Sequence, residues 1–331
     1  MRRMSENELK IFTNLAKLTP DGLLESLSRY LKKYYKKIIR KEKYLYAIGD
    51  IPIALIAHAD TVFSKPPDEI FYDMNKNVIW GGANGLGADD RAGIFAILKI
   101  IQECKNGKPH IIITTEEELG CIGAKELICD NPKNFAPMKY IIQLDRRGKD
   151  DCVFYQCGNS QFIEYISAFG FIKRYGSFSD ISVICPSWDI AGVNLSIGYE
   201  DEHSYSERLY VSHMFETIDK VLLLLEDVKN LDYDFEYAKD ISDDYYYNLV
   251  VPSATGDIVV CHKCGNSYPD YETFFVQEKN KEYHIWCPEC ITKNIKWCDR
   301  CGGPFETSEL SQNWCYECRD EGEKSNATKR N

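Results

Sequence analysis

The feature that most constrains the fold is a regular alternation of short apolar runs with helical patterns between residues 44 and 228. Segments with strand character are 44–49, 51–60, 110–120, 139–148 and 193–199. Segments whose apolar residues recur every three or four positions, and which therefore predict helices, are 92–104, 123–129 and 211–228. Strands that alternate with helices indicate an α/β fold, with a mostly parallel or mixed sheet and helices on both of its faces.

The N-terminal stretch 5–43 is expected to be helical, with a break at Pro20 and Gly22. Its second half is strongly basic, and a basic amphipathic helix can bind a membrane or a nucleic acid. We favour the simpler interpretation of a solvated outer face, because Leu31, Tyr35 and Ile39 recur at a four-residue spacing that suits contact with a core.

The charge and the hydropathy of the chain restrict its partners. The 331 residues carry a formal net charge of −11, which argues against general binding to nucleic acid. The first residues show no apolar signal core, and the longest apolar run, 221–225, is too short to span a bilayer. We therefore expect a soluble, cytoplasmic protein without a membrane partner.

Eight of the fourteen cysteines form four C-x-x-C pairs near the C-terminus: Cys261/Cys264, Cys287/Cys290, Cys298/Cys301 and Cys315/Cys318. Two such pairs supply the four thiolates of a tetrahedral zinc site, so the eight cysteines predict two structural zinc ions. The simplest arrangement is sequential, with the first two pairs on one zinc, although an interleaved one is also compatible with the spacing. The other six cysteines are interpreted as small core residues.

Acidic and histidine residues follow the apolar runs at their carboxyl ends. His58 and Asp60 follow one run, three glutamates from Glu116 follow the next, and Asp145 and His203 follow two more. Each has an ordinary explanation as a loop residue. Their convergence on the ligand-binding edge of an α/β sheet would be electrostatically costly without cations. Imidazole and carboxylate together suit zinc, with manganese or cobalt as alternatives.

The motifs AHADTV, GLGADDRAG, TTEEELG, LDRRG and GYEDEHS resemble, in chain order, those of the co-catalytic di-zinc exopeptidases. That superfamily includes peptidase T, leucyl-type aminopeptidases and related carboxypeptidases. The resemblance implies that two catalytic metals are held by His58, Asp89, Glu118, Asp145 and His203, with Asp89 bridging them. It also implies that Asp60 orients His58 and that Glu117 is the general base. Asp90, next to the bridging ligand, is interpreted as a structural residue at the helix start.

The function implied is hydrolysis of a peptide bond by a metal-bridging hydroxide, whose proton Glu117 accepts and then delivers to the leaving amine. One alternative is an amide deacylase that uses the same metal centre. Another is an inactive peptidase fold that serves as a binding scaffold, although the complete ligand set argues against it.

Only 57 residues lie between Asp145 and His203, too few for the inserted lid domain of many relatives. Compact relatives without a lid are often aminopeptidases, so the short connection favours an aminopeptidase here. Tentative substrate contacts near the metals are Arg91, Arg146, Arg147 and Tyr199, each of which also has a structural interpretation. The segment with Ser177, Ser179 and Asp180 is interpreted as a turn or a pocket wall.

The predicted organisation is a catalytic domain over 1–228, a linker or edge element over 229–257, two zinc ribbons over 258–320 and a disordered tail over 321–331. Acidic side chains outnumber basic ones between 258 and 320, so binding of nucleic acid is not favoured there. We expect the ribbons to contact a protein partner or to recruit substrate.

Overall fold

The computed structural model describes residues 2–130, 138–155, 157–174, 176, 178–227, 258–269, 274–277, 283–297 and 304–306. Contacts divide the chain into two compact units, one of 1–173 with 178–238 and one of 174–177 with 239–331.

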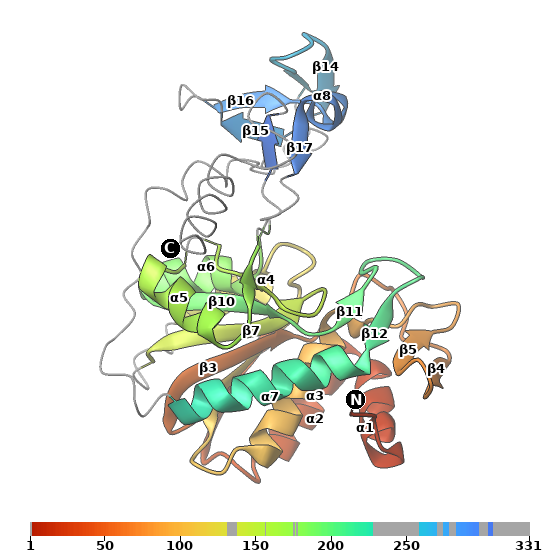
Figure 1. Cartoon of the computed structure of the whole chain (residues 1–331), viewed down its shortest axis with the longest axis vertical. Coiled ribbons are helices and arrows are strands. Elements are labelled where there is room, and N and C mark those ends of the chain that lie inside the picture. The colour runs from red at the N-terminus through yellow and green to blue at the C-terminus, as the bar shows by residue number, and fades with distance from the viewer. Residues whose placement is uncertain are drawn as a thin grey trace, which may run out of the picture. The chain divides into compact units, whose positions relative to one another are not determined.

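The centre of the first unit is an eight-stranded mixed sheet in the order β1-β2-β6-β3-β7-β10-β8-β9 (Figure 1). Its strands are β1 (Lys37–Arg40), β2 (Tyr44–Ile48), β3 (Ile51–His58), β6 (Pro109–Thr114), β7 (Tyr140–Arg146), β8 (Asp151–Val153), β9 (Ile172–Lys173) and β10 (Ala191–Ser196). The four central strands β6, β3, β7 and β10 are parallel to one another, so their carboxyl ends meet at one edge. These are the strands expected from the apolar runs.

Helices cover both faces of this sheet (Figure 1). On one face lie α1 (Glu6–Ala16), α2 (Pro20–Leu31), α3 (Ala88–Glu103) and α7 (Val211–Asp227), and on the other lie α4 (Ile122–Asp130), α5 (Ser160–Ala168) and α6 (Asp180–Trp188). Every residue of β6 and β10 is buried, as expected of strands covered on two sides. The predicted α/β class and its mixed sheet are confirmed.

The N-terminal segment departs from the expected helices. Helix α1 begins after Ser5, which forms a capping box with Glu8, and α2 begins at Pro20 after the N-cap Thr19. The chain then leaves the helix after Leu31 and forms the edge strand β1. The prediction of helix as far as residue 43 was therefore wrong. Strand β1 has a basic residue at each end, Lys37 and Arg40, and is partly exposed along its whole length, which suits an edge strand.

A small antiparallel sheet positions part of the site. It has the order β11-β12-β5-β4 and consists of β4 (Ile70–Asp73), β5 (Val78–Gly81), β11 (Tyr199–Glu200) and β12 (Arg208–Tyr210). Its β11–β12 connection carries His203, and the chain after β5 leads into the glycine-rich turn before α3. This sheet was not predicted, because its strands have only two to four residues.

The second unit contains three two-stranded antiparallel pairs among its described residues. They are β13 (Ile258–Val260) with β14 (Ser267–Pro269), β15 (Phe274–Gln277) with β16 (Tyr283–Trp286), and β17 (Ile295–Trp297) with β18 (Pro304–Glu306). A short helix, α8 (Pro288–Asn294), follows β16. The described residues include no helix with the length and hydropathy needed to cross a membrane.

Candidate metal centre

The loops after β3 and β6 are joined by Asp60. His58 is the last residue of β3, and its Nδ1 lies 3.4 Å from Oδ1 of Asp60. The backbone N–H groups of Glu117 and Glu118 donate to the two oxygens of the same carboxylate, at 3.2 and 3.1 Å. Asp60 therefore fixes His58 relative to the loop that carries both glutamates.

Asp89 lies between two histidines that are far apart in the sequence. Its Oδ1 is 3.1 Å from Nε2 of His58, and its Oδ2 is 3.2 Å from Nε2 of His203. Asp145 Oδ1 approaches the first imidazole at 3.3 Å, and Glu118 Oε2 approaches the second at 3.1 Å. The five side chains thus form two groups of three, each with ligand atoms within 4.8 Å of one another, and Asp89 is common to both.

The electrostatics of these groups fit divalent cations. The hydrogen bonds to Asp89 and Glu118 raise the pKa of His203 to about 11. Burial raises the pKa of Asp145 to about 7, against the opposing effect of His58. The His203 shift reflects the carboxylates that surround this imidazole, whose negative charge cations would neutralise. Oε1 of Glu118 is also buried without a hydrogen-bond partner in the described part of the chain, as expected of an oxygen reserved for a metal.

The two adjacent aspartates of GLGADDRAG have different tasks. Both have non-helical backbone angles at the start of α3, and the peptide bond between them is cis. Asp90 is fully buried; its Oδ2 accepts from the N–H of His58 at 3.2 Å and its Oδ1 from the N–H of Gly93 at 2.9 Å. Asp90 therefore joins the end of β3 to the first turn of α3, consistent with the structural role expected from the sequence.

Glycine is required where this turn is crowded. Gly87 has φ +68°, and a Cβ there would lie 2.9 Å from Cγ2 of Thr61. A Cβ on Gly93 would lie 2.0 Å from the carbonyl oxygen of Leu144, so α3 packs directly on β7 at this point.

Glu207 is a component that the sequence reasoning missed. Its carboxylate accepts from the N–H groups of Ala88 at 2.9 Å and Asp89 at 3.0 Å, and its side chain is almost completely buried. Burial raises its pKa to about 7. Glu207 thus caps α3 from a loop more than a hundred residues away and holds the backbone of the shared carboxylate. Sequence patterns for helix caps involve residues next to the helix, so they could not indicate a capping residue this far along the chain.

A dense hydrogen-bond network fixes Asp145. Its Oδ2 accepts from Nε2 of Gln143 at 2.9 Å and from Oγ of Ser179 at 3.0 Å. Its Oδ1 accepts from the hydroxyl of Tyr199 at 3.1 Å, and its N–H donates to Oδ1 of Asn194. The buried Tyr199 therefore supports Asp145, which accounts for this tentative substrate contact structurally.

The other tentative substrate contacts have partners of their own. Arg91 is buried, with Nη1 donating to the carbonyl of Leu15 at 2.8 Å and Nη2 to that of Leu18 at 3.0 Å. Arg147 pairs with Glu202 at 3.0 Å. Arg146 is half-buried at the end of β7, and Ser177 lies outside the described residues. Arg91 connects the end of α1 to α3 through the carbonyls of Leu15 and Leu18.

The three consecutive glutamates face different partners. Glu116 pairs with Lys43, and Glu118 faces His203. Glu117 is buried, with Oε1 4.0 Å from Sγ of Cys121. Burial raises its pKa to about 9, a rise that His58 opposes and Asp145 supports. A divalent cation beside this carboxyl would lower that value towards the range of a working base.

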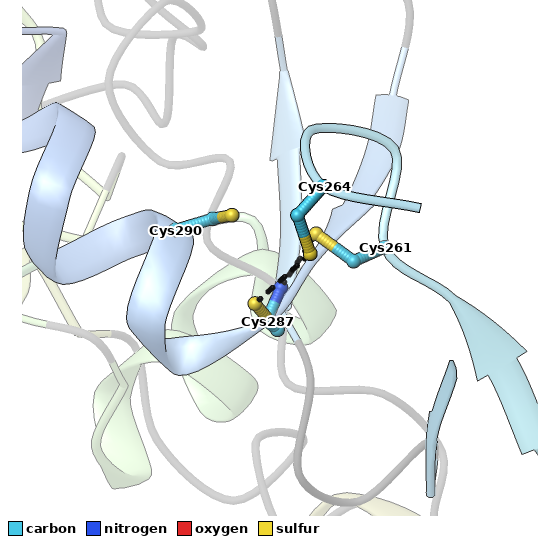
Figure 2. Close-up of side chains that lie close together, drawn as sticks. All are labelled: Cys261, Cys264, Cys287 and Cys290. Atoms are coloured by element: carbon cyan, nitrogen blue, oxygen red, sulfur yellow. Dashed lines mark hydrogen bonds between the residues drawn. The ribbon is translucent and has the colours of Figure 1, made fainter. Parts of the chain in front are cut away.

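The first two cysteine pairs come together in the second unit. The sulfur atoms of Cys261, Cys264, Cys287 and Cys290 all lie within 4.8 Å of one another. Figure 2 shows these four side chains. Sγ of Cys264 lies 3.8 Å from Sγ of Cys287, whose N–H donates to Sγ of Cys261 at 3.2 Å. Burial raises the pKa of Cys261, but backbone N–H groups lower it to about 6, which favours the thiolate.

This four-cysteine cluster was predicted, and its grouping is that of the sequential arrangement. Cys298, Cys301, Cys315 and Cys318 lie outside the described residues. Of the six scattered cysteines, five are buried as expected: Cys104, Cys121, Cys152, Cys157 and Cys185. Cys129 is exposed, so its interpretation as a core residue was wrong.

The fold and the converging side chains define an α/β unit of the zinc-exopeptidase type with a four-cysteine cluster after it. The sequence profile of peptidase family M28 matches residues 41–169, so this segment of the chain is similar to that family. The similarity expected from the motifs is confirmed. No curated protein sequence matches the chain.

Several solved structures share the fold. The aminopeptidase PepT from Bacillus cereus is 15% identical, with a TM-score of 0.54 over 68% of this chain and 98% of its own. A tripeptidase from Staphylococcus aureus is 15% identical, with a TM-score of 0.54 over 70% of this chain and 100% of its own. A TET aminopeptidase from a marine-sediment thaumarchaeon is 12% identical, with a TM-score of 0.52 over 68% and 99%. At these identities the similarity establishes the fold.

Proposed function

We propose that the first unit is a metal-dependent peptidase, an aminopeptidase in the first instance, with two catalytic zinc ions. Asp89 carries this proposal, because its two oxygens each lie close to a different histidine. A carboxylate in that position is suited to bridge two metals. His58 and Asp145 would complete one metal site, and Glu118 and His203 the other. The match of 41–169 to peptidase family M28 supports this assignment.

When bound, a pair of zinc ions supplies an acidified water and polarises the scissile carbonyl. In this proposal Glu117 is the proton carrier. It is adjacent to a ligand but is itself not one of the grouped ligand residues, so it remains able to titrate. Its carboxylate would accept a proton from water and later transfer that proton to the leaving amine. Asp60 keeps Glu117 in place by accepting its backbone N–H.

The second unit is proposed to hold structural zinc through the four-cysteine cluster. By extension, Cys298, Cys301, Cys315 and Cys318 are proposed to hold a second structural zinc. These sites would stabilise a small unit, in whose described part Cys261, Trp286, Cys287 and Cys290 form a buried cluster. The recruitment of a protein partner by this unit stays a prediction.

The test of the catalytic assignment is Glu117→Gln in the full chain. Loss of the proton carrier is expected to lower kcat by at least about 100-fold, while elemental analysis still finds both catalytic metals. The matched control is Glu116→Gln, a neighbouring glutamate that pairs with Lys43 and should retain activity within about twofold. Full activity of Glu117→Gln would refute its role as the base.

A substrate panel separates peptidase from deacylase chemistry, since both would use the same residues. Aminoacyl anilides, N-blocked peptides and N-acyl amino acids are compared at equal concentration. The proposed aminopeptidase cleaves the first class and rejects blocked amino termini. Preference for N-acyl substrates would instead favour the deacylase.

A further inference from the structure

Arg91 is the one lysine or arginine that is buried among the residues whose exposure the structure describes, with 3% of its surface exposed. Its Nη1 and Nη2 donate to the carbonyls of Leu15 and Leu18, which are neutral acceptors. Its Nε is buried and has no acceptor in the described part of the chain. An arginine is seldom buried unless a negative group accompanies it, because an unpaired charge is costly to remove from water.

Two carboxylates act on Arg91 electrostatically but are bonded elsewhere. Burial lowers the pKa of Arg91 to about 10, and the charges of Asp60 and Asp90 oppose this effect. Asp60 accepts two backbone N–H groups from the loop after β6, and Asp90 accepts one from β3 and one from α3. Both carboxylates are thereby committed to backbone donors, and the donor at Nε of Arg91 stays unused.

A cavity of about 100 Å³ adjoins Arg91. Its walls come from the connection between α1 and α2, the loop after β3 and the glycine turn before α3. Among the described residues that line it, the two charged side chains are Arg91 and Lys65, and both are basic. Thr19, Thr61 and Ser64 contribute hydroxyl groups, and most of the other lining side chains are apolar. The cavity therefore combines a positive charge with apolar walls.

The start of α2 adds to the positive potential of this cavity. Thr19, the N-cap of α2, and Pro20, its first residue, both line the cavity. The N-terminus of a helix carries a partial positive charge, which favours anions. The acidic residue of the first turn, Asp21, is paired with Arg40. The helix end and the buried guanidinium therefore favour the same kind of ligand.

We propose that this cavity binds a small carboxylate, whose oxygens accept hydrogen bonds from Nε of Arg91 and from the amine of Lys65. The planar guanidinium matches the geometry of a carboxylate, and the apolar walls suit a short hydrocarbon chain better than a hydrated phosphate or sulfate. Pockets for larger ligands measure roughly 300 to 1,000 Å³. The smaller volume here fits a free acid of a few carbons rather than the end of a peptide.

This site is separate from the proposed metal centre, because none of the grouped metal-ligand residues lines the cavity. It nevertheless adjoins two loops of that centre. Thr61 directly follows Asp60, and Gly87 lies two residues before Asp89. A bound carboxylate would contact both loops, whether or not the chain is a peptidase.

The test is calorimetric titration of the full chain with sodium butyrate, against sodium chloride at equal ionic strength. The wild type should bind butyrate saturably. Arg91→Met should weaken binding at least about tenfold, since a hydrogen bond to a charged group is lost. Lys65→Glu should weaken it at least about fivefold, because the charge at the cavity is reversed. The matched control is Lys10→Glu on the exposed face of α1, which should stay within about twofold of the wild type.

Thermal unfolding gives a second readout. Butyrate at ten times its dissociation constant should raise the melting temperature of the wild type by about 3 °C and leave that of Arg91→Met unchanged. Circular dichroism verifies that each variant is folded, and Lys65→Glu alters an exposed side chain, so it tests the site even if Arg91→Met does not fold.

Three results would overturn the proposal. Equal binding of butyrate by the wild type and both variants would place the ligand elsewhere, such as on the metals. Chloride or phosphate that binds as tightly as butyrate would refute the preference for a carboxylate. Displacement of butyrate by an N-blocked tripeptide would assign the cavity to peptide binding instead.

Discussion

Glu207 offers the sharpest test of how the site is held together. It lies outside the two groups of predicted ligands, yet it accepts the N–H groups of Ala88 and Asp89 from a buried position. In Glu207→Ala both donors lose their acceptor. A buried unpaired N–H costs about 1 to 3 kcal/mol, so we expect the free energy of unfolding to fall by about 3 kcal/mol.

The glutamine variant is expected to be milder. Glu207→Gln keeps one acceptor oxygen and removes a charge that is itself expensive to bury, since burial raises the pKa of Glu207 to about 7. We expect a loss of about 1 kcal/mol, from one poorer hydrogen bond. Because the backbone of Asp89 would be less firmly fixed, both variants should bind the catalytic metals about 10- to 100-fold more weakly.

Urea unfolding followed by circular dichroism measures the first effect, and competition with a chelator measures the second. Glu216→Gln is the matched control, because that exposed glutamate pairs with Lys149 at the surface and should cost less than about 1 kcal/mol. If Glu207→Ala unfolds at the same urea concentration as the control and retains its metals equally well, the idea that this carboxylate supports the site is wrong.

Two further predictions concern a buried histidine and a buried arginine. His110 is buried and accepts the N–H of Gly49, and burial lowers its pKa to about 4. Its folded pKa is below the unfolded value of about 6.5, so the stability it contributes is complete above pH 6.5 and is lost as the pH falls towards 4, by about 3 kcal/mol. In His110→Asn the urea midpoint should change less with pH over that range than it does in the wild type. An equally steep dependence of the midpoint on pH would contradict this. Arg91→Met should lower the free energy of unfolding by about 2 kcal/mol, because two carbonyls lose their donors, yet leave KM within about twofold. A raised KM at unchanged stability would restore Arg91 as a substrate contact.

The central sheet could be predicted because burial on both faces leaves a direct trace in the sequence. Strands such as β6 are buried along their whole length and contain an unbroken apolar run, here 111–113, which polar residues follow. Parallel strands bring those ends to one edge, so the convergence of His58, Asp145 and Glu118 on that edge was expected from the topology. Their division between two metal sites was expected only from the resemblance to the di-zinc exopeptidases. The edge strand β1 could not be predicted in this way. It lies in a basic stretch where the spacing of Leu31, Tyr35 and Ile39 also fits an amphipathic helix.

Polar contacts between residues far apart in the chain could not be predicted from the sequence for a different reason. Glu207 caps a helix from a distant loop, and Arg91 binds carbonyls at the end of α1. Neither partner can be recognised from the sequence, because nearly every residue carries the same backbone N–H and carbonyl groups. The partner of Tyr199 was equally unpredictable, because any buried acceptor could receive its hydroxyl hydrogen bond, and in the structure Asp145 does.

The division of work between neighbouring acids follows from backbone geometry. Successive residues in non-helical backbone point to different sides, so adjacent carboxylates need not share a partner. Asp89 faces the two histidines, while Asp90 is turned towards the backbone of β3 and α3. Glu117 and Glu118 separate in the same way, one towards Cys121 and the other towards His203. A site that requires many negative charges can therefore be built from short acidic runs, because each neighbour that does not bind metal is neutralised or hydrogen-bonded elsewhere. That arrangement limits the repulsion which would otherwise disfavour folding before any cation binds.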